Sequence, residues 1–198
     1  MRGEEKIHTE LLVGQFGVVA VHGGLIQHST FEAIRNYLAR KLRKGKSFAF
    51  YRVDAPYKPV TRMSAGKKHG GGKSSIHHYA TPVKAGRVIL ELGGNIYWEE
   101  AQPWLKNVAS MLPCEAIAVN KDLLERIKQE EIRLTHENEN PYTFEWMIRN
   151  NIRDCHNFMS PYDQKWFGKF VYKDRHHNKK WNLVRQSKYK SNQAFSGN

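Results

Sequence analysis

Lysines and glycines gather in the run from Thr61 to Ser75, and this combination can hold phosphate groups. Lysine ammonium groups attract phosphate oxygens, while glycine lets the backbone approach a partner closely and adopt positive φ. The run lies within residues 35–90, which contain fourteen Lys and Arg residues and a single acid, Asp54. The sequence therefore predicts contact with a polyphosphate, and the candidates are a nucleotide, DNA and RNA.

The order Gly71-Gly72-Lys73-Ser74 also invites comparison with a nucleotide-binding phosphate loop. Such a loop needs Gly-x-x-x-x-Gly-Lys-Ser between a strand and a helix, whose N-terminus then faces the phosphates. Here Lys67 stands where the first glycine is required, and residues 76–83 predict an extended segment instead of a helix. The pattern favours a loop that reaches into folded nucleic acid over a phosphate-loop enzyme or a glycine loop without function.

Other residue types that carry out chemistry lack the partners they would need. The pairs His77-His78 and His176-His177 have no Cys or His at metal-ligand spacing, and neighbours on a strand point to opposite faces. Nothing in the sequence would activate Cys155 beside His156 as a nucleophile. Cys114 is the only other cysteine, so a reducing compartment is the default. We therefore expect no catalytic residue, no metal and no cofactor.

The chain of 198 residues has a net charge of +13 at pH 7, which predicts an anionic partner. The charge is segregated, because residues 99–145 contain ten acids and five bases, whereas residues 165–190 contain nine bases and one acid. This division predicts one surface for a polyanion and another for water or protein. Hydrophobic residues make up 40% of the chain, which is enough for a core.

Hydrophobic periodicity predicts the elements that position these residues. A strand is expected over residues 10–21 and a helix over 29–44, with Ser29 and Glu32 at capping-box spacing. Apolar side chains recur at helical spacing along this helix and should face the core: Phe31, Ile34, Leu38 and Leu42. Strands follow over 47–54, 76–83, 87–92 (ended by Gly93-Gly94) and 115–119, and a second helix over 99–112. These elements predict an α+β fold with two helices on a largely antiparallel sheet.

Beyond residue 120 the pattern changes to a helical and irregular extension. We expect a charged helix over 120–136 with Asn120 as its cap, another helix over 143–153, and a turn at Ser160-Pro161-Tyr162-Asp163. The aromatic residues after Lys165 have two open interpretations, stacking on bases and packing on the main domain. The chain thus divides into an N-terminal extension (1–10), a core (11–120) and a C-terminal extension (121–198) that is loose after about residue 186.

Several motifs, in order and at matching separations, resemble ribosomal protein sixteen of the large subunit. The similarity spans about residues 11–120 and is carried by Val18-Val19-Ala20-Val21, Lys58-Pro59-Val60-Thr61-Arg62-Met63, the segment from Pro82 to Gly94, and Ala109-Ser110-Met111-Leu112-Pro113. Later stretches resemble the mitochondrial branch of this family from animals: Asn140-Pro141-Tyr142-Thr143-Phe144-Glu145, Ser160-Pro161-Tyr162-Asp163 and Gly168-Lys169-Phe170.

The resemblance implies an α/β-hammerhead core and a structural, non-enzymatic place in the mitochondrial large ribosomal subunit, in the matrix. It implies large-subunit rRNA and neighbouring ribosomal proteins as partners, aminoacyl-site tRNA as a further candidate partner, and no small-molecule substrate. No membrane partner is expected, because no run approaches the ~18 apolar residues of a membrane helix. The implied position is near the aminoacyl-tRNA path, where family members support translation and subunit assembly. The chain departs from the bacterial pattern in its stretched loop, where Ser64 follows Met63, and in its acidic start, where Glu4 and Glu5 replace a basic arm.

Three groups of residues are the predicted rRNA contacts. In the loop, basic side chains meet phosphates and glycines allow close approach, while a second basic strip follows the first helix and a smaller group surrounds residue 86. The full set is Arg62, Lys67, Lys68, Gly70, Gly71, Gly72, Lys73, Arg35, Arg40, Lys41, Arg43, Lys44, Lys46, Lys84 and Arg87. The rival interpretations are a free-standing RNA-binding or chaperone module and a phosphate-loop enzyme.

Overall fold

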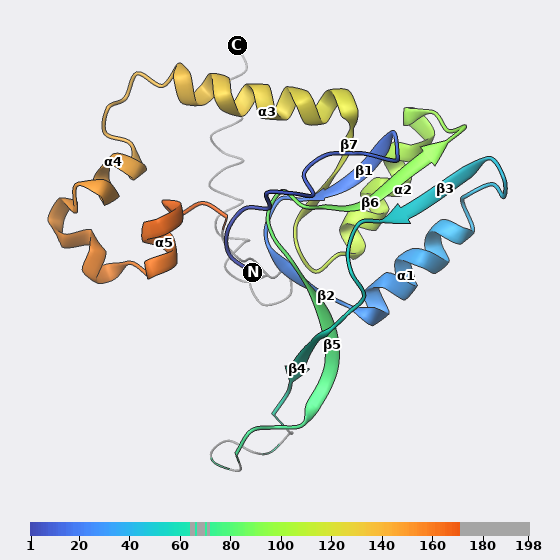
Figure 1. Cartoon of the computed structure of the whole chain (residues 1–198), viewed down its shortest axis with the longest axis horizontal. Helices are drawn as coiled ribbons and strands as arrows, with labels where there is room; N and C mark the ends of the chain where they lie inside the picture. Colours follow the sequence, from blue (N-terminus) through green and yellow to red (C-terminus); the bar gives the residue numbers. More distant parts are fainter. Residues whose placement is uncertain (64–65, 67–69, 71, 171–198) are drawn as a thin grey trace.

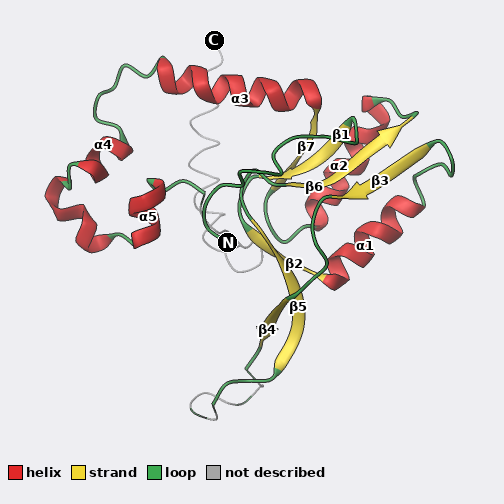
Figure 2. Cartoon of the chain, in the orientation of Figure 1, coloured by secondary structure: helices red, strands yellow, loops and turns green. Residues whose placement is uncertain are grey.

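Four strands form the central sheet of the computed structural model, which describes residues 1–170 apart from 64–65, 67–69 and 71. They are β1 (Phe16–Ala20), β3 (Ser47–Tyr51), β6 (Val88–Gly94) and β7 (Ala116–Asn120), in the order β3-β6-β1-β7. Every neighbouring pair in this sheet is antiparallel. Helices and strands are mixed along the chain (Figure 2), so the predicted α+β class is confirmed.

Two helices, α1 (His28–Ala39) and α2 (Trp98–Met111), pack against one face of this sheet (Figure 1). Ile34 and Leu38 of α1 are buried, as the helical spacing predicted, and Phe31 and Leu42 pack at the edge of the same core. Leu105 of α2 is fully buried in the same cluster. Full burial of such a side chain contributes about 1.5–3 kcal/mol, so this shared core is the main source of stability for the layer.

The ends of α1 differ from the sequence prediction. The capping box at Ser29 is wrong, because the helix begins at His28 with Gln27 at the N-cap position and no side-chain cap. Glu32 is instead paired with Arg35, with 2.6 Å between Oε2 and Nη2. The helix ends at Ala39, five residues before the predicted end, because the N–H groups of Lys41 and Leu42 both donate to the Leu38 carbonyl and close the last turn.

The other face of the sheet is crossed by residues 11–15, which were predicted to continue the first strand. That part of the prediction is wrong: β1 begins at Phe16, and the preceding residues are bound by the buried carboxylate of Glu91 in β6. The carboxylate accepts hydrogen bonds from the backbone N–H groups of Leu12, Val13 and Gly14 at 3.3, 2.8 and 2.7 Å. Arg52 completes the site, with its Nε 3.2 Å from Glu91 Oε1. A fully buried carboxylate needs such partners, and the chain supplies them from two segments, residues 12–14 and Arg52.

Gly93 and Gly94 are the last two residues of β6, so the strand does not end at Leu92 as predicted. Gly93 pairs with Phe48 of β3 and Gly94 with Ser47. A Cβ atom at Gly93 would lie 2.5 Å from the Phe48 ring, so a side chain there would require this ring to move. The two glycines therefore extend the sheet beneath an aromatic side chain.

A second, three-stranded antiparallel sheet has the order β2 (Gly24–Gln27), β5 (Ile76–Val83) and β4 (Lys58–Thr61). The inner half of β5 is buried at Ala80, Thr81 and Val83, whereas its outer half and β4 are largely exposed. We call β4, β5 and the loop between them the β4–β5 arm. In Figure 1 the outer part of this arm extends away from the rest of the protein.

Helices dominate after β7. The helix α3 (Lys121–His136) begins at the predicted cap, where Asn120 Oδ1 accepts from the N–H of Leu123 at 2.6 Å. The predicted helix over 143–153 is too long: α4 (Phe144–Arg149) ends where Asn151 takes a left-handed conformation, and the 3-10 helix η1 (Ile152–Phe158) follows. The predicted turn at Ser160 is in fact the start of α5 (Pro161–Trp166), because Ser160 Oγ caps the N–H of Asp163 at 3.2 Å.

The prediction that the chain is loose after about residue 186 lies outside the described residues. Within the described part of the chain, none of the helices has the length and apolarity needed to cross a membrane.

The contacts of Glu91 predict a strong effect on stability. Replacing Glu91 by Ala should lower the free energy of unfolding by about 3–5 kcal/mol, because Arg52 and three N–H groups lose a buried partner. Urea denaturation followed by circular dichroism measures this change. Glu130→Ala is the matched control, since its pair with Arg133 is exposed and should contribute about 0.5 kcal/mol or less. Equal effects of the two substitutions would contradict this account of Glu91.

Candidate nucleic-acid interface

The tip of the β4–β5 arm carries the loop residues that the sequence selected. Arg62 and Lys73 are exposed where the two strands lead into the loop. Gly70 and Gly72 have φ values of +74° and +70°, and a Cβ atom at either would meet nothing within 4 Å. Lys67, Lys68 and Gly71 lie outside the described residues. The described glycines thus adopt a backbone conformation that favours glycine, in open space where a partner can approach.

The root of the arm is fixed to the body of the protein. β5 pairs with β2 from Ala80 to Val83, and with β4 from Ile76 to Ala80. The hydroxyl of Thr81, which is 1% exposed, donates to the carbonyl of Asp54 at 2.9 Å, so the linker into β4 is held against β5. A two-stranded hairpin is marginally stable by itself, and this buried root is what orients the exposed tip.

The second predicted group lies in the turn between α1 and β3. Its members are all exposed, and we call residues 40–46 the basic turn: Arg40, Lys41, Arg43, Lys44 and Lys46. The Ser47 hydroxyl accepts from the N–H of Arg43 at 2.8 Å, and Gly45 has a φ of +74°, so the turn has a defined path. Arg35 lies earlier on α1, where its pair with Glu32 offsets its charge.

Lys84 and Arg87 belong to a different environment. Lys84 is half-buried in the turn between β5 and β6. The Arg87 side chain is 15% exposed, and its guanidinium donates to the Arg52 carbonyl at 3.1 Å. It also lies 3.4 Å from a Glu5 oxygen and 3.9 Å from an Asp54 oxygen. Arg87 therefore joins segments within the protein, and the interface that we propose leaves it out.

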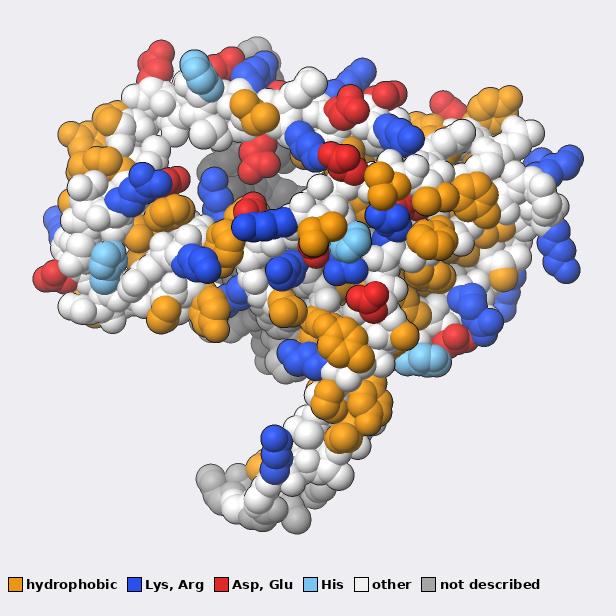
Figure 3. Space-filling view, in the orientation of Figure 1, with side chains coloured by type: hydrophobic (Ala, Val, Ile, Leu, Met, Phe, Trp, Pro, Cys, Tyr) orange, Lys and Arg blue, Asp and Glu red, His pale blue; other side chains and the backbone are white. Residues whose placement is uncertain are grey.

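The charges on the two exposed groups are not offset by neighbouring acids in sequence. Residues 55–83 contain five Lys and Arg residues and no acid, and residues 40–53 contain six and no acid. Figure 3 shows basic side chains at the outer end of α1 and β3, whereas acids and bases alternate along α3. On α3, for example, Arg133 is 2.6 Å from Glu130 and 3.9 Å from Glu137. The arm and the basic turn are therefore the surfaces suited to a polyanion.

Residues 1–119 match the family described as ribosomal protein L16p/L10e. The chain belongs to this family. Members of the family are structural components of the large ribosomal subunit and take part in translation, and they are not enzymes. Membership implies that the partners include rRNA and other ribosomal proteins.

The rival phosphate-loop interpretation disagrees with this family and with the geometry. The element after Lys73 is the strand β5, so the helix N-terminus that would hold phosphates is replaced by extended backbone. The arm of this L16p/L10e member therefore offers side-chain charges and glycine backbone to a phosphate chain, without the enclosed site of a nucleotide-binding enzyme.

Among the described residues, neither the histidine pair nor Cys155 forms part of a metal site or a catalytic site. The rings of His77 and His78 meet, with their Nδ1 atoms 2.8 Å apart, so the prediction that they point to opposite faces is wrong. Even so, no cluster of three potential metal ligands occurs among the described residues. His156 Nε2 is 2.6 Å from the Ile148 carbonyl, and the Cys155 thiol is directed at the Met147 carbonyl, so the pair forms no nucleophile–base contact.

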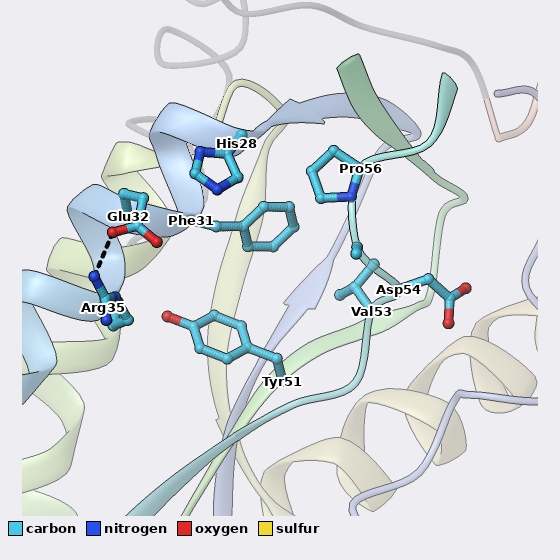
Figure 4. A pocket seen from close by; sticks show the side chains of 9 residues that line it. His28, Phe31, Glu32, Arg35, Tyr51, Val53, Asp54 and Pro56 are labelled. Carbon is cyan, nitrogen blue, oxygen red and sulfur yellow. Dashed lines mark hydrogen bonds and ion pairs between the residues drawn. The ribbon is translucent and has the colours of Figure 1, made fainter. Parts of the chain in front are cut away.

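A cavity of about 210 Å³ opens between α1 and the segment after β3 (Figure 4). Its floor is aromatic, because the rings of Phe31 and Tyr51 meet edge to face at 5.8 Å. Burial raises the pKa of Tyr51, although the nearby Arg35 charge acts in the opposite direction, so the hydroxyl is neutral at pH 7. The positive charge of Arg35, which lines the cavity, is already offset by Glu32. The cavity is therefore poorly suited to phosphate, and we place the interface on the arm and the basic turn.

The sequence did not single out Glu91, which holds Arg52 at the start of the linker into the arm. The signal was present: one acid stands in the otherwise apolar strand Val88–Gly94, where an isolated charge implies a buried partner. Its partner Arg52 directly follows β3. The backbone donors of residues 12–14 have no sequence signature at all.

Arg87 and Arg62 should separate folding from RNA binding. Arg87→Ala should lower the free energy of unfolding by about 1.5–3 kcal/mol, because hydrogen bonds that involve a charged group are lost, and should leave the affinity for an rRNA transcript unchanged. Arg62→Ala should weaken binding to the rRNA transcript and leave the free energy of unfolding unchanged, because its side chain is exposed on the arm. Urea denaturation and filter binding measure the two quantities. A loss of RNA affinity by the Arg87 variant at unchanged stability would return this residue to the interface.

Proposed function

We propose that this protein is a constituent of the mitochondrial large ribosomal subunit that binds its rRNA through the β4–β5 arm and the basic turn. The observation that carries the proposal is the exposed arm, which contains no acid and presents Arg62 and Lys73 at its tip. An arm that packs on little of its own chain has a large surface for a partner. Phosphate groups are the partner that its cationic and glycine-rich tip suits best.

The finer location follows from the family. We place the protein near the aminoacyl-tRNA path, with the arm directed toward the peptidyl transferase region, where it supports translation and subunit assembly. The mitochondrial assignment is supported by the stretches at residues 140–145, 160–163 and 168–170, which resemble the animal mitochondrial branch. Large-subunit rRNA and neighbouring ribosomal proteins are the proposed partners, and aminoacyl-site tRNA is a further one.

Sedimentation of a mitochondrial lysate through a sucrose gradient tests the proposal. The protein should migrate with the large ribosomal subunit at moderate salt, and RNase treatment should release it. Migration as a free protein of 23.0 kDa would overturn the ribosomal assignment. Migration with RNA outside the ribosome would indicate a free-standing RNA-binding module instead.

The lysines of the arm should set the salt dependence of RNA binding. Replacing Lys67, Lys68 and Lys73 by Ala should weaken binding to the rRNA transcript. On duplex-like sites it should also reduce the slope of log affinity against log salt by about one unit for each phosphate that is no longer neutralised. Titrations at several salt concentrations measure both quantities. The matched control removes three exposed charges elsewhere, at Lys106, Lys121 and Arg126. An unchanged slope in the arm variant would contradict the assignment of the arm.

A side chain at the tip of the arm should disturb assembly more than folding. Gly72→Val adds its bulk in open space, so the core is untouched, although valine is strained at a φ of +70°. We expect reduced incorporation into large subunits and a nearly unchanged melting temperature. Gly14→Ala should instead lower the melting temperature, because its Cβ would lie 2.6 Å from the Leu92 carbonyl oxygen. Normal incorporation of a strongly destabilised Gly72 variant would reverse this interpretation.

A further inference from the structure

Two aromatic side chains are exposed on the outer face of β3. Phe48 and Phe50 are 42% and 47% exposed, whereas Ala49 and Tyr51 between and after them pack against the core. Large apolar side chains at neighbouring positions on one face of a strand lie about 7 Å apart. Figure 3 shows hydrophobic side chains gathered over the region of β3 and β6. The two rings therefore form an uncovered aromatic surface beside the basic turn.

The Phe48 ring is supported from below by the sheet. Three of its atoms would lie 2.5–3.1 Å from a Cβ at Gly93, so the ring occupies the space that a side chain on β6 would take. Its position is thus set by the absence of a side chain on the neighbouring strand. A ring held in this way has one side against the sheet and presents the rest outward, which reduces the entropy lost when a flat partner binds.

The electrostatic surroundings of these rings favour a nucleic acid. Residues 40–53 contain six Lys and Arg residues and no acid, and the exposed Lys44 and Lys46 come directly before β3. The carboxylate opposite Phe50 belongs to Glu91, which is fully buried and paired with Arg52. Protein interfaces are depleted of lysine, whereas aromatic rings beside cationic side chains are the arrangement that binds single-stranded nucleic acid.

We propose that Phe48 and Phe50 stack on unpaired bases of rRNA while the basic turn contacts the adjoining phosphates. This inference rests on the proposed function and deepens it, since it assigns the outer face of β3 to single-stranded nucleotides. Stacking is tolerant of sequence because every base has a π-face. The aliphatic side chains of Leu12 and Val13, which are 64% and 54% exposed, are not part of the stacking surface.

The test uses the full chain and a fluorescein-labelled, unstructured twelve-nucleotide RNA of adenosines, with binding followed by fluorescence anisotropy. Phe50→Leu and Phe48→Leu should each weaken binding roughly ten-fold, in line with the usual effect of removing one stacking side chain. Phe50→Tyr and Phe48→Tyr should bind as the wild type, because a π-face is retained. The salt slope should stay unchanged in all four variants, since no charge is removed.

The double variant Leu12→Ser, Val13→Ser removes two exposed aliphatic side chains and is the control for binding of an apolar protein surface. Wild-type binding with unchanged affinity in both leucine variants would overturn the stacking proposal and leave the proposed function intact, whereas failure of the wild type to bind RNA would count against the function itself. The proposal would also be overturned if the serine variant and the leucine variants all had normal RNA affinity but were incorporated poorly into subunits. That result would indicate that this face of the sheet binds a protein. The Phe50 variants should fold normally, because the Phe50 ring is not the one that lies over Gly93. Melting temperatures identify any Phe48 variant that unfolds.

Discussion

The buried carboxylate of Glu91 is the interaction on which the rest of the structure depends. A carboxylate removed from water is costly unless it is paired and hydrogen-bonded, and this one takes three backbone N–H groups and Arg52 as its partners. It thereby directs the segment before β1 across the outer face of the sheet. It also holds Arg52, which directly follows β3, so one charge fixes both the segment before β1 and the start of the linker toward the arm.

The linker from β3 to β4 is held by three contacts at Arg52 and Asp54, and this explains how an exposed arm keeps its direction. Arg52 is paired with Glu91, the carbonyl of Arg52 accepts from Arg87, and the carbonyl of Asp54 accepts from Thr81. These contacts all lie at the root, whereas Gly70 and Gly72 are open at the tip. The contacts that stabilise the fold therefore lie at the root of the hairpin, whereas the proposed contact with RNA lies at its tip.

The separation of charge along the chain matches a division between surfaces. The arm and the basic turn combine exposed lysine and arginine with glycine backbone, as phosphate binding requires. On α3, Arg133 pairs with Glu130 and lies near Glu137, and Lys128 is 3.5 Å from Glu10, so part of the charge of this helix is offset locally. Membership of this family implies both rRNA and other ribosomal proteins as partners, and the two kinds of surface suit these two classes of partner.

Local patterns in the sequence determined the fold class, the core positions of α1, the Asn120 cap and the family, because periodicity, capping and motif order are properties of short stretches. They also located the basic loop and the basic turn. The tertiary structure alone decided where residues 11–15 run, why Gly93 continues a strand, and that Arg87 is committed to contacts within the protein. Each of these depends on groups far apart in the chain, such as Glu91 with Val13, Phe48 with Gly93, and Arg87 with Glu5. Burial and pairing between distant segments leave no local pattern, so only the folded chain reveals them.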